Sequence, residues 1–206
     1  MILIGQYDSP FVRRVGIALR LYDLTFGHRP WSVFGDAGKL GAINPLCRVP
    51  TLILDDGFVL TDSHMILDYL DSMVAAPMFP REQPERLRAL QVTALAMGLA
   101  EKAVSLFYER RLHAVTSPVW VARCEGQIRA VLAALEAERH NRPGPQWWGN
   151  AISHTDIAVT CALRFVGDAH AAVFELAAYP ALSGHARRYE EMPVFAEISQ
   201  AFVAPA

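Results

Sequence analysis

Residues 2–11 have the sequence Ile2-Leu3-Ile4-Gly5-Gln6-Tyr7-Asp8-Ser9-Pro10-Phe11, in which an apolar strand runs directly into a helix that begins at a proline. The pattern predicts a strand over residues 2–7 and a helix over residues 10–22. Serine followed by proline is a common helix start, because the serine oxygen can cap the helix and proline has no N–H to satisfy. The hydroxyl of Ser9 is therefore expected at the junction of strand and helix.

The region up to about residue 76 alternates short β-like runs with helical patterns. A second strand is expected over residues 25–30, and a hairpin over residues 51–54 and 58–60, turned by Asp55-Asp56-Gly57. In the helix of residues 10–22 the apolar residues form one buried face, outside which we expect Arg13, Arg14 and Arg20. A βαβ unit followed by a hairpin and a helix predicts a small mixed sheet covered by helices.

After about residue 80 almost every pattern is helical. Prolines at 77, 80 and 84 predict a linker over residues 77–84, between domains of residues 1–76 and 85–206. A long helix is expected over residues 85–113, and another from Pro118 to a stop before Asn141-Arg142-Pro143-Gly144-Pro145. Ser153 and Asp156 have capping-box spacing before a segment that is apolar all round, which predicts the central helix of an all-helical domain.

Composition excludes several classes of function. The 206 residues carry a net charge of −2 with a pI near 6.4, which gives no bulk attraction to nucleic acid or anionic lipid. We expect no apolar run of membrane-spanning length and no signal peptide, and therefore a cytoplasmic protein. The cysteines are odd in number and far apart in the sequence, at Cys47, Cys124 and Cys161, so we expect reduced thiols. The spacing of histidines and cysteines predicts no metal site.

Four motifs together resemble the cytosolic glutathione S-transferase family over nearly the whole chain. They are Tyr-x-Ser-Pro-Phe at residues 7–11, Asn-Pro-Leu-x-Arg-Val-Pro-Thr-Leu at 44–52, Asp62-Ser63 before a helix, and the Ser-x-x-Asp start at 153–156. The Ser-Pro-Phe form is similar to the serine-type classes, both plant tau-type enzymes and related bacterial ones. The resemblance implies a thioredoxin-like N-terminal domain, an all-helical C-terminal domain, glutathione as co-substrate and a homodimer.

The same resemblance assigns roles to particular residues. Ser9 would donate a hydrogen bond to the glutathione thiolate, although capping the helix is an equally natural role for it. Val49 and Pro50 would form a cis step whose backbone pairs with the cysteinyl unit. Asp62 and Ser63 would receive the γ-glutamyl end, or simply cap the next helix. Many members of the family carry Glu where this chain has Asp62, which leaves that contact open.

Weaker candidates surround this set. Arg48, or Lys39 in the loop after the second strand, could pair with the glycine carboxylate of glutathione. Tyr7 is a rival hydroxyl for the thiol and more typical of buried core, and Cys47 could form a mixed disulfide with glutathione.

The resemblance also implies a hydrophobic electrophile bound between the domains. Its candidate lining residues, which are equally typical of plain core, are Phe11, Phe34, Met97, Tyr108 and Trp120.

The sequence therefore predicts a transferase in which glutathione attacks a hydrophobic electrophile or an organic peroxide. The alternative is a non-catalytic member that binds glutathione or a protein partner. A third possibility, isomerase or dehalogenase chemistry without glutathione, would need acid-base groups that the sequence does not identify.

Overall fold

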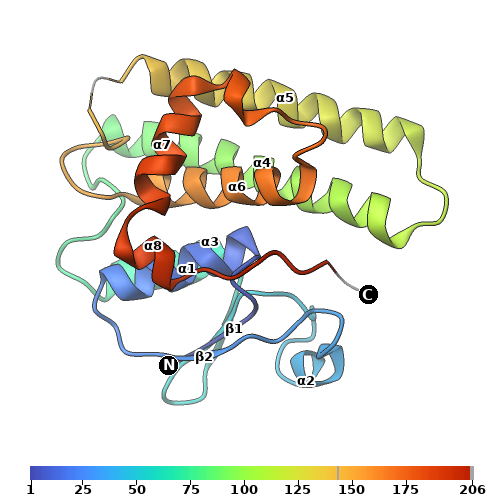
Figure 1. The fold of residues 1–206 in the computed structure, drawn as a ribbon. Coiled ribbons are helices and arrows are strands. Elements are labelled where there is room, and N and C mark those ends of the chain that lie inside the picture. The colour runs from blue at the N-terminus through green and yellow to red at the C-terminus, as the bar shows by residue number, and fades with distance from the viewer. Residues whose placement is uncertain (143, 205–206) are drawn as a thin grey trace. The chain divides into compact units, whose positions relative to one another are not determined.

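The computed structural model describes residues 1–142 and 144–204, which form two compact units (Figure 1). The N-terminal unit consists of Met1–Pro77 together with the C-terminal segment from Met192 onward, and the helical unit is Met78–Glu191. The expected second domain ran from residue 85 to residue 206, so the return of the C-terminal segment to the first unit differs from that expectation. Pro143 in the expected helix stop and residues 205–206 in that domain lie outside the described residues.

A four-stranded mixed sheet forms the centre of the N-terminal unit. Its strands are β1 (Ile2–Ile4), β2 (Gly27–Arg29), β3 (Thr51–Ile53) and β4 (Val59–Thr61), in the spatial order β2-β1-β3-β4. β1 pairs parallel with β2 and antiparallel with β3, so that Leu3 lies opposite both His28 and Leu52. The predicted βαβ unit and hairpin are confirmed, and the arrangement is thioredoxin-like. The hairpin turns at Gly57, whose φ of +88° favours glycine.

β1 is shorter than predicted because Gly5 turns the chain out of the sheet. Gly5 has φ +129°, and a Cβ at this position would lie 2.5 Å from Val12 Cγ2 and 2.8 Å from Val49 Cβ. Only glycine combines this backbone conformation with such close neighbours. The end of the strand is thereby brought against both the first helix and the loop that contains Val49.

Four helices lie in the described part of the N-terminal unit: α1 (Pro10–Leu21), α2 (Ala37–Gly41), α3 (Ser63–Ser72) and α8 (Pro193–Glu197). The prediction of α1 over residues 10–22 is confirmed to within one residue. The expectation that Arg13 and Arg14 lie outside its buried face is wrong, because they are 2% and 1% exposed. Each has a hydrogen-bonding partner inside the unit that offsets the cost of burial, as described below.

The helical unit contains α4 (Glu85–Leu112), α5 (Pro118–His140), α6 (His154–His170), the short 3₁₀ segment η1 (Leu176–Ala178) and α7 (Pro180–Glu190). α4 packs against both α5 and α6, and α7 packs against α5 and α6 (Figure 1). The predicted helices over residues 85–113 and from Pro118 are confirmed. All but a few residues of α6 are buried, including all of residues 158–163, as the apolar sequence of that stretch predicts.

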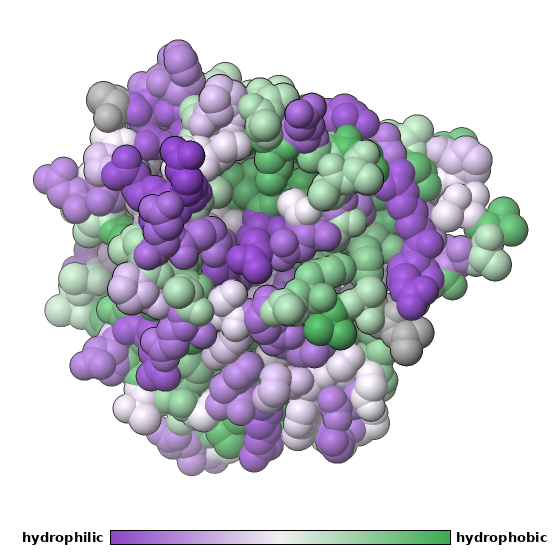
Figure 2. Space-filling model, in the orientation of Figure 1, coloured by the Kyte–Doolittle hydropathy of each residue, from purple (hydrophilic) through white to green (hydrophobic). Residues whose placement is uncertain are grey.

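By length and composition alone, α4 is apolar enough to cross a membrane, so the expectation that no segment reaches this limit is corrected. The core helix of a soluble protein passes the same test, and the packing of α4 on α5 and α6 accounts for its apolar surface. Hydrophobic and hydrophilic residues are interspersed on the face drawn in Figure 2. The loop between α4 and α5, at the right of that view, carries exposed apolar residues such as Val115, which is 87% exposed.

The predicted capping box at the start of α6 is confirmed, and it is part of a larger buried network. Ser153 Oγ accepts from Asp156 N at 3.3 Å, and Asp156 Oδ2 accepts from Ser153 N at 2.8 Å. Asp156 Oδ1 also accepts from Trp147 N at 2.7 Å, and no part of the side chain of Asp156 is exposed. The capping box therefore fixes the segment before α6 as well as the helix itself.

His185 of α7 lies next to this network and makes the stability of the chain sensitive to acid. Its Nε2 lies 3.4 Å from Asp156 O and its ring is 5.3 Å from that of Trp147, while Arg139 and Arg188 add positive charge nearby. Burial is the main cause that lowers the pKa of His185 to about 3. In the unfolded chain the same side chain takes up a proton near pH 6.5.

We therefore expect the free energy of unfolding to decrease as the pH is lowered, since the unfolded state binds more protons than the folded state between about pH 6.5 and pH 3. His185 alone should contribute a loss of about 2 kcal/mol in the free energy of unfolding between pH 7 and pH 5. Urea unfolding of the wild type and of His185→Gln at both pH values measures this difference. An equal pH dependence in the two proteins would contradict the assignment to His185.

Candidate functional site

Ser9 caps α1, so the structural role proposed for it from the sequence is present. Its Oγ accepts from Val12 N at 3.4 Å, and Pro10 occupies the first helical position. Capping uses a lone pair of the oxygen, so the hydroxyl hydrogen stays available to a further acceptor. The capping role and a donor role toward a thiolate are therefore chemically compatible in this half-buried side chain.

A tight turn over Gln6–Ser9 presents this hydroxyl. Ser9 N donates to Gln6 O at 3.2 Å, which closes the turn, and Arg13 N donates to Ser9 O at 2.9 Å to begin the helix. Gly5 precedes the turn and lies against Val49. The sequence analysis missed the role of Gly5, although a glycine directly after an apolar strand is a signal for close backbone approach.

The loop that leads to β3 carries the predicted Val49–Pro50 step. This peptide bond is cis, as the family resemblance implied. Pro50 is buried and Val49 half-buried. Among residues 1–142 and 144–204, neither the N–H nor the carbonyl of Val49 takes part in a hydrogen bond. The backbone at Val49 can therefore pair with an extended peptide.

Asn44 holds this loop in shape, and the sequence analysis did not single it out. Its Nδ2 donates to Arg48 O and to Thr51 Oγ1, both at 3.0 Å, and its Oδ1 accepts from Leu46 N at 3.0 Å. Asn44 is only 1% exposed. One buried amide thus connects both ends of the segment that contains Val49 and Pro50.

Replacing Asn44 with alanine is expected to lower the free energy of unfolding by about 2 kcal/mol, because three hydrogen bonds are lost. Among the described residues, Leu46 N then has no partner, while Arg48 O and Thr51 Oγ1 keep only the bond between them. Glutathione affinity should fall severalfold because the Val49 backbone is no longer held in place. Calorimetric titration with glutathione, beside urea unfolding, checks both effects. Unchanged glutathione affinity in a folded Asn44→Ala protein would show that the loop does not depend on this amide.

Asp62 and Ser63 begin α3, and both capping and binding remain chemically possible there. Asp62 is the cap: its Oδ1 accepts from His64 N at 2.7 Å. Its φ of +68° is uncommon for a non-glycine residue. Ser63 is 2% exposed, and Arg14 Nη1 donates to its Oγ at 3.4 Å. The buried guanidinium of α1 therefore lies next to the N-terminus of α3.

The two candidates for binding the glycine carboxylate, Arg48 and Lys39, are both exposed on the N-terminal unit. Lys39 lies in α2, where a loop was expected, and its Nζ is 2.7 Å from Asp36 Oδ1 and 5.7 Å from the ring centre of Trp31. The hydrogen bond from Lys39 is the main cause that lowers the pKa of Asp36. Lys39 is therefore already engaged with an acid, which makes Arg48 the stronger candidate for a ligand carboxylate.

Tyr7, the rival hydroxyl, is half-buried and its ring is packed against other groups of the N-terminal unit. Its ring stacks on that of His28 with centroids 3.9 Å apart, and a Cβ on Gly16 would lie 2.9 Å from its Cε1. Burial is the largest cause that raises the pKa of Tyr7 to about 12, so the phenol is neutral at physiological pH. Its geometry is that of a ring wedged between His28 and α1.

Cys47 has φ +50°, and its Sγ lies 3.4 Å from Ala37 O. This contact ties the thiol to α2.

The structure distributes the five candidate pocket residues between the two units. Phe11, at the second position of α1, is half-buried, and Phe34, before α2, is 44% exposed. In α4, Met97 is 4% exposed and Tyr108 is half-buried. Eleven residues separate these two, about three helical turns, so they share one side of α4.

Trp120 does not join Met97 and Tyr108. Lys102 Nζ lies 5.7 Å from the ring centre of Trp120, and Lys102 follows Met97 by five residues. That spacing places Lys102 more than about 100° around the helix from Met97. Trp120 therefore packs beside a different side of α4.

Within the described part of the chain, no group of three or more His, Cys, Asp or Glu side chains is placed to hold a metal ion. The absence of a metal requirement stays a prediction.

Comparison with known proteins matches both units. A family model for the glutathione S-transferase N-terminal domain matches residues 3–78, and one for the C-terminal domain of the same family matches residues 118–188. YibF of Escherichia coli K12, an uncharacterized GST-like protein, is 34% identical over 168 residues, which span 81% of this chain and 82% of YibF. Glutathione S-transferase U4 of Arabidopsis thaliana is 30% identical over 116 residues, 50% of this chain and 52% of its own length.

Among solved structures, a glutathione S-transferase from Methylobacterium radiotolerans in complex with glutathione sulfonate superposes with a TM-score of 0.89. It is 26% identical in sequence, and the match covers 100% of this chain and 98% of that one.

Proposed function

Because the chain belongs to the glutathione S-transferase family, we propose that it binds glutathione in the N-terminal unit and activates the thiol with the Ser9 hydroxyl. The single observation that carries this proposal is the geometry at the start of α1. There, Ser9 caps the helix with a lone pair, keeps its hydrogen to donate, and follows the Gly5 contact with Val49. The solved relative with bound glutathione sulfonate supports glutathione as the co-substrate.

Activation means favouring the thiolate over the thiol. A free thiol titrates near pH 8.5, so only a small fraction is ionised at neutral pH. A hydroxyl donor at a helix N-terminus stabilises the anion through one charge-assisted hydrogen bond and through the helix dipole. Lowering the thiol pKa by about two units corresponds to about 2.7 kcal/mol of preference for the anion.

The remainder of the tripeptide extends from this point in both directions. The Val49 backbone pairs with the cysteinyl unit as an added strand would. The α3 N-terminus at Ser63, supported by the charge of Arg14, receives the γ-glutamyl carboxylate, while Asp62 accepts from its amino group. Arg48 pairs with the glycine carboxylate, and Lys39 is a secondary candidate because Asp36 already holds it.

The thiolate then attacks an electrophilic carbon of a hydrophobic substrate, and a carbon–sulfur bond forms as a leaving group such as a halide departs with its electron pair. With an organic peroxide, a sulfur–oxygen bond forms as the peroxide bond breaks and the alcohol is released, and a second glutathione then converts the sulfenic acid to glutathione disulfide and water. Phe11 lies two residues after Ser9, so its half-buried ring is the nearest apolar candidate in the sequence, and Phe34 offers a more exposed one. Holding thiolate and electrophile together supplies the second main contribution to the rate.

A glutathione titration followed by ultraviolet thiolate absorbance, and then by turnover, tests the proposal. The electrophile panel contains aryl halides, isothiocyanates and organic peroxides. We expect a thiolate signal at neutral pH and turnover with at least one member of the panel. No glutathione binding would overturn the proposal.

One observation favours a non-catalytic member of the same fold as the second candidate. Ser9 caps α1, so its presence is explained by structure even without turnover. In that case glutathione binds, yet no thiolate signal and no turnover are observed.

A homodimer and a cytoplasmic location complete the proposal. At α3, Met65 and the C-terminal capping residue Met73 are 58% and 47% exposed, and their spacing of eight residues places them about 80° apart around the helix axis. Exposed apolar residues on one helix side are typical of subunit interfaces. Sedimentation should give twice the chain mass of 22.8 kDa, and Met65→Glu should shift the equilibrium toward monomer.

A further inference from the structure

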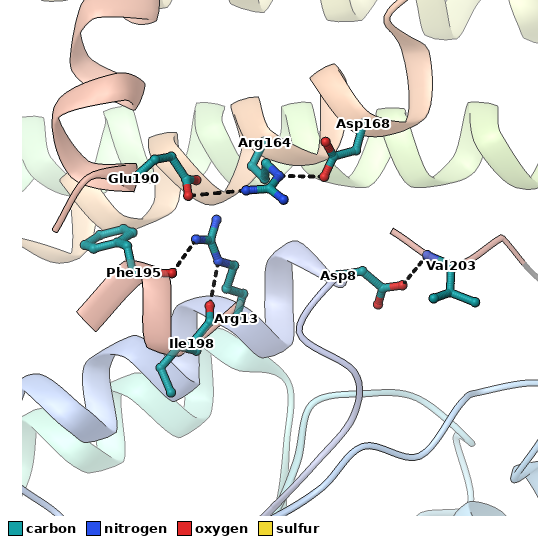
Figure 3. Close-up of polar contacts among 8 residues, drawn as sticks. All are labelled: Asp8, Arg13, Arg164, Asp168, Glu190, Phe195, Ile198 and Val203. Carbon is teal, nitrogen blue, oxygen red and sulfur yellow. Dashed lines mark hydrogen bonds and ion pairs between the residues drawn. The ribbon is translucent and has the colours of Figure 1, made fainter. Parts of the chain in front are cut away.

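The C-terminal segment of residues 199–203, here called the tail, is bonded to the turn that presents Ser9. Tyr7 N donates to Gln200 Oε1 at 2.8 Å. Val203 N donates to Asp8 Oδ2 at 3.1 Å, as drawn in Figure 3. Tyr7 and Asp8 are the two central residues of the Gln6–Ser9 turn, so the tail bonds to both of them.

The chain before the tail is anchored along α1. Arg13 donates from Nε to Ile198 O at 2.8 Å and from Nη2 to Phe195 O at 2.9 Å (Figure 3). Gly16 allows the close approach, because a Cβ there would lie 2.8 Å from Ile198 Cγ2. Arg20 Nη2 adds an ion pair to Glu197 Oε1 at 2.8 Å. Three successive helical turns of α1 therefore contact α8 and the residue that follows it. These contacts place the tail next to the Gln6–Ser9 turn.

The hydrogen bonds of the turn explain why the tail is needed. Closing the turn uses Ser9 N and Gln6 O, which leaves Tyr7 N to find another acceptor at a half-buried residue. A buried donor without a partner is costly, and Gln200 supplies that partner. Without this bond the turn keeps its closing hydrogen bond from Ser9 N to Gln6 O but loses a restraint at Tyr7, which allows the Ser9 hydroxyl to shift. Displacements of about 1 Å at a reacting group can change rates strongly.

We propose that Gln200 is a positioning residue, and that the tail fixes the orientation in which Ser9 meets the glutathione thiol. This inference rests on the proposed function of Ser9. It assigns part of thiol activation to a segment almost 200 residues away in sequence from Ser9. Gln200 acts through the backbone of Tyr7 and does not contact the sulfur itself.

Two substitutions remove the two bonds separately, and the chain offers a matched control. Gln200→Met keeps the length of the side chain and removes the acceptor. Val203→Pro removes the N–H that donates to Asp8, whereas Val203→Ala shortens the same side chain, which is 57% exposed, and keeps the N–H. Each variant is measured for amide hydrogen exchange at Tyr7, for the pH profile of thiolate absorbance with bound glutathione, and for kcat and KM.

In Gln200→Met we expect exchange at Tyr7 to accelerate about tenfold and kcat/KM to fall about threefold to tenfold, the range that one neutral hydrogen bond supplies. The apparent thiol pKa should rise by about half a unit, with the melting temperature within a few degrees of wild type. Val203→Pro should act in the same direction, and Val203→Ala should match the wild type.

Two results overturn the inference: unchanged Tyr7 exchange in Gln200→Met, or faster exchange with an unchanged thiol pKa and kcat. Wild type and Ser9→Ala, measured in the same way, separate this failure from failure of the proposed function. If Ser9→Ala loses the thiolate signal and Gln200→Met keeps it unchanged, the role of the tail is contradicted and the proposed function of Ser9 is supported. If the wild type gives no thiolate signal, both fail together.

Discussion

Ser9→Ala is expected to lower the turnover of glutathione with its electrophile at least about tenfold and to raise the apparent pKa of the bound thiol. The variant loses the hydroxyl donor, while the α1 N-terminus and the Val49 backbone stay in place to bind the peptide. One charge-assisted hydrogen bond contributes about 1.5–3 kcal/mol, which corresponds to roughly a tenfold to hundredfold change. Glutathione affinity, by contrast, should change little. Steady-state kinetics and the pH profile of thiolate absorbance measure the two effects.

Stability must be separated from chemistry because Ser9 also caps α1. Its bond to Val12 N is long, at 3.4 Å, so we expect a loss of about 1 kcal/mol or less and a small change in melting temperature. Ser117 provides a matched control: it also precedes a proline, and its Oγ accepts from Trp120 N at 3.4 Å at the start of α5. Ser117→Ala should destabilise the protein by a similar amount and leave turnover intact.

The outcomes then distinguish the two roles of Ser9. If Ser9→Ala and Ser117→Ala lose equal stability and only the first loses turnover, the hydroxyl has a chemical role. Wild-type turnover in Ser9→Ala would move thiol activation elsewhere, and Tyr7 would have to be tested next. The raised pKa of Tyr7 disfavours its ionised form, and its ring is stacked on His28, but the neutral phenol can still donate a hydrogen bond.

Local patterns were sufficient for most of the fold. The seam at Ser9-Pro10, the turn at Gly57 and the capping box at Ser153 and Asp156 each act over a few residues, so their chemistry is visible in the sequence. The same is true of α4 and α5, whose lengths make their start signals easy to place. Of the candidate site residues, Ser9 lies in one of these local motifs, and the structure places Ser9, Val49 and Ser63 in one unit.

Features that depend on distant partners were not visible. Arg13 and Arg14 carry charge, and charge predicts an exposed position. Their burial depends on Ile198 O, Phe195 O and Ser63 Oγ, which lie far along the chain. The five-residue helices α2 and α8 span less than two turns, too few for a periodic pattern to be recognised. The contact of Gln200 with Tyr7 could not be anticipated either, because it also joins residues that lie far apart in the sequence.

Asp156→Ala is expected to lower the free energy of unfolding by about 3–5 kcal/mol, the largest effect on stability among the substitutions considered. The carboxylate accepts from Trp147 N, Ser153 N and Ser153 Oγ at 2.7, 2.8 and 2.6 Å. Burial raises the pKa of Asp156, while these donors act in the opposite direction. Alanine removes the only acceptor that these backbone donors have among the hydrogen bonds of residues 1–142 and 144–204. Urea unfolding followed by helical circular dichroism measures the loss.

Two further variants give this prediction its controls. Asp156→Asn keeps one acceptor oxygen and removes the buried charge, so its cost should lie well below that of alanine. Asp168→Ala changes an exposed acid of the same helix, paired to Arg164 Nε at 2.6 Å (Figure 3), and should cost no more than about 0.5 kcal/mol. Equal losses in Asp156→Ala and Asp168→Ala would mean that α6 does not depend on its capping box. Since α6 packs along α4 and α7, the large loss at Asp156 should extend to the unfolding of the helical unit as a whole.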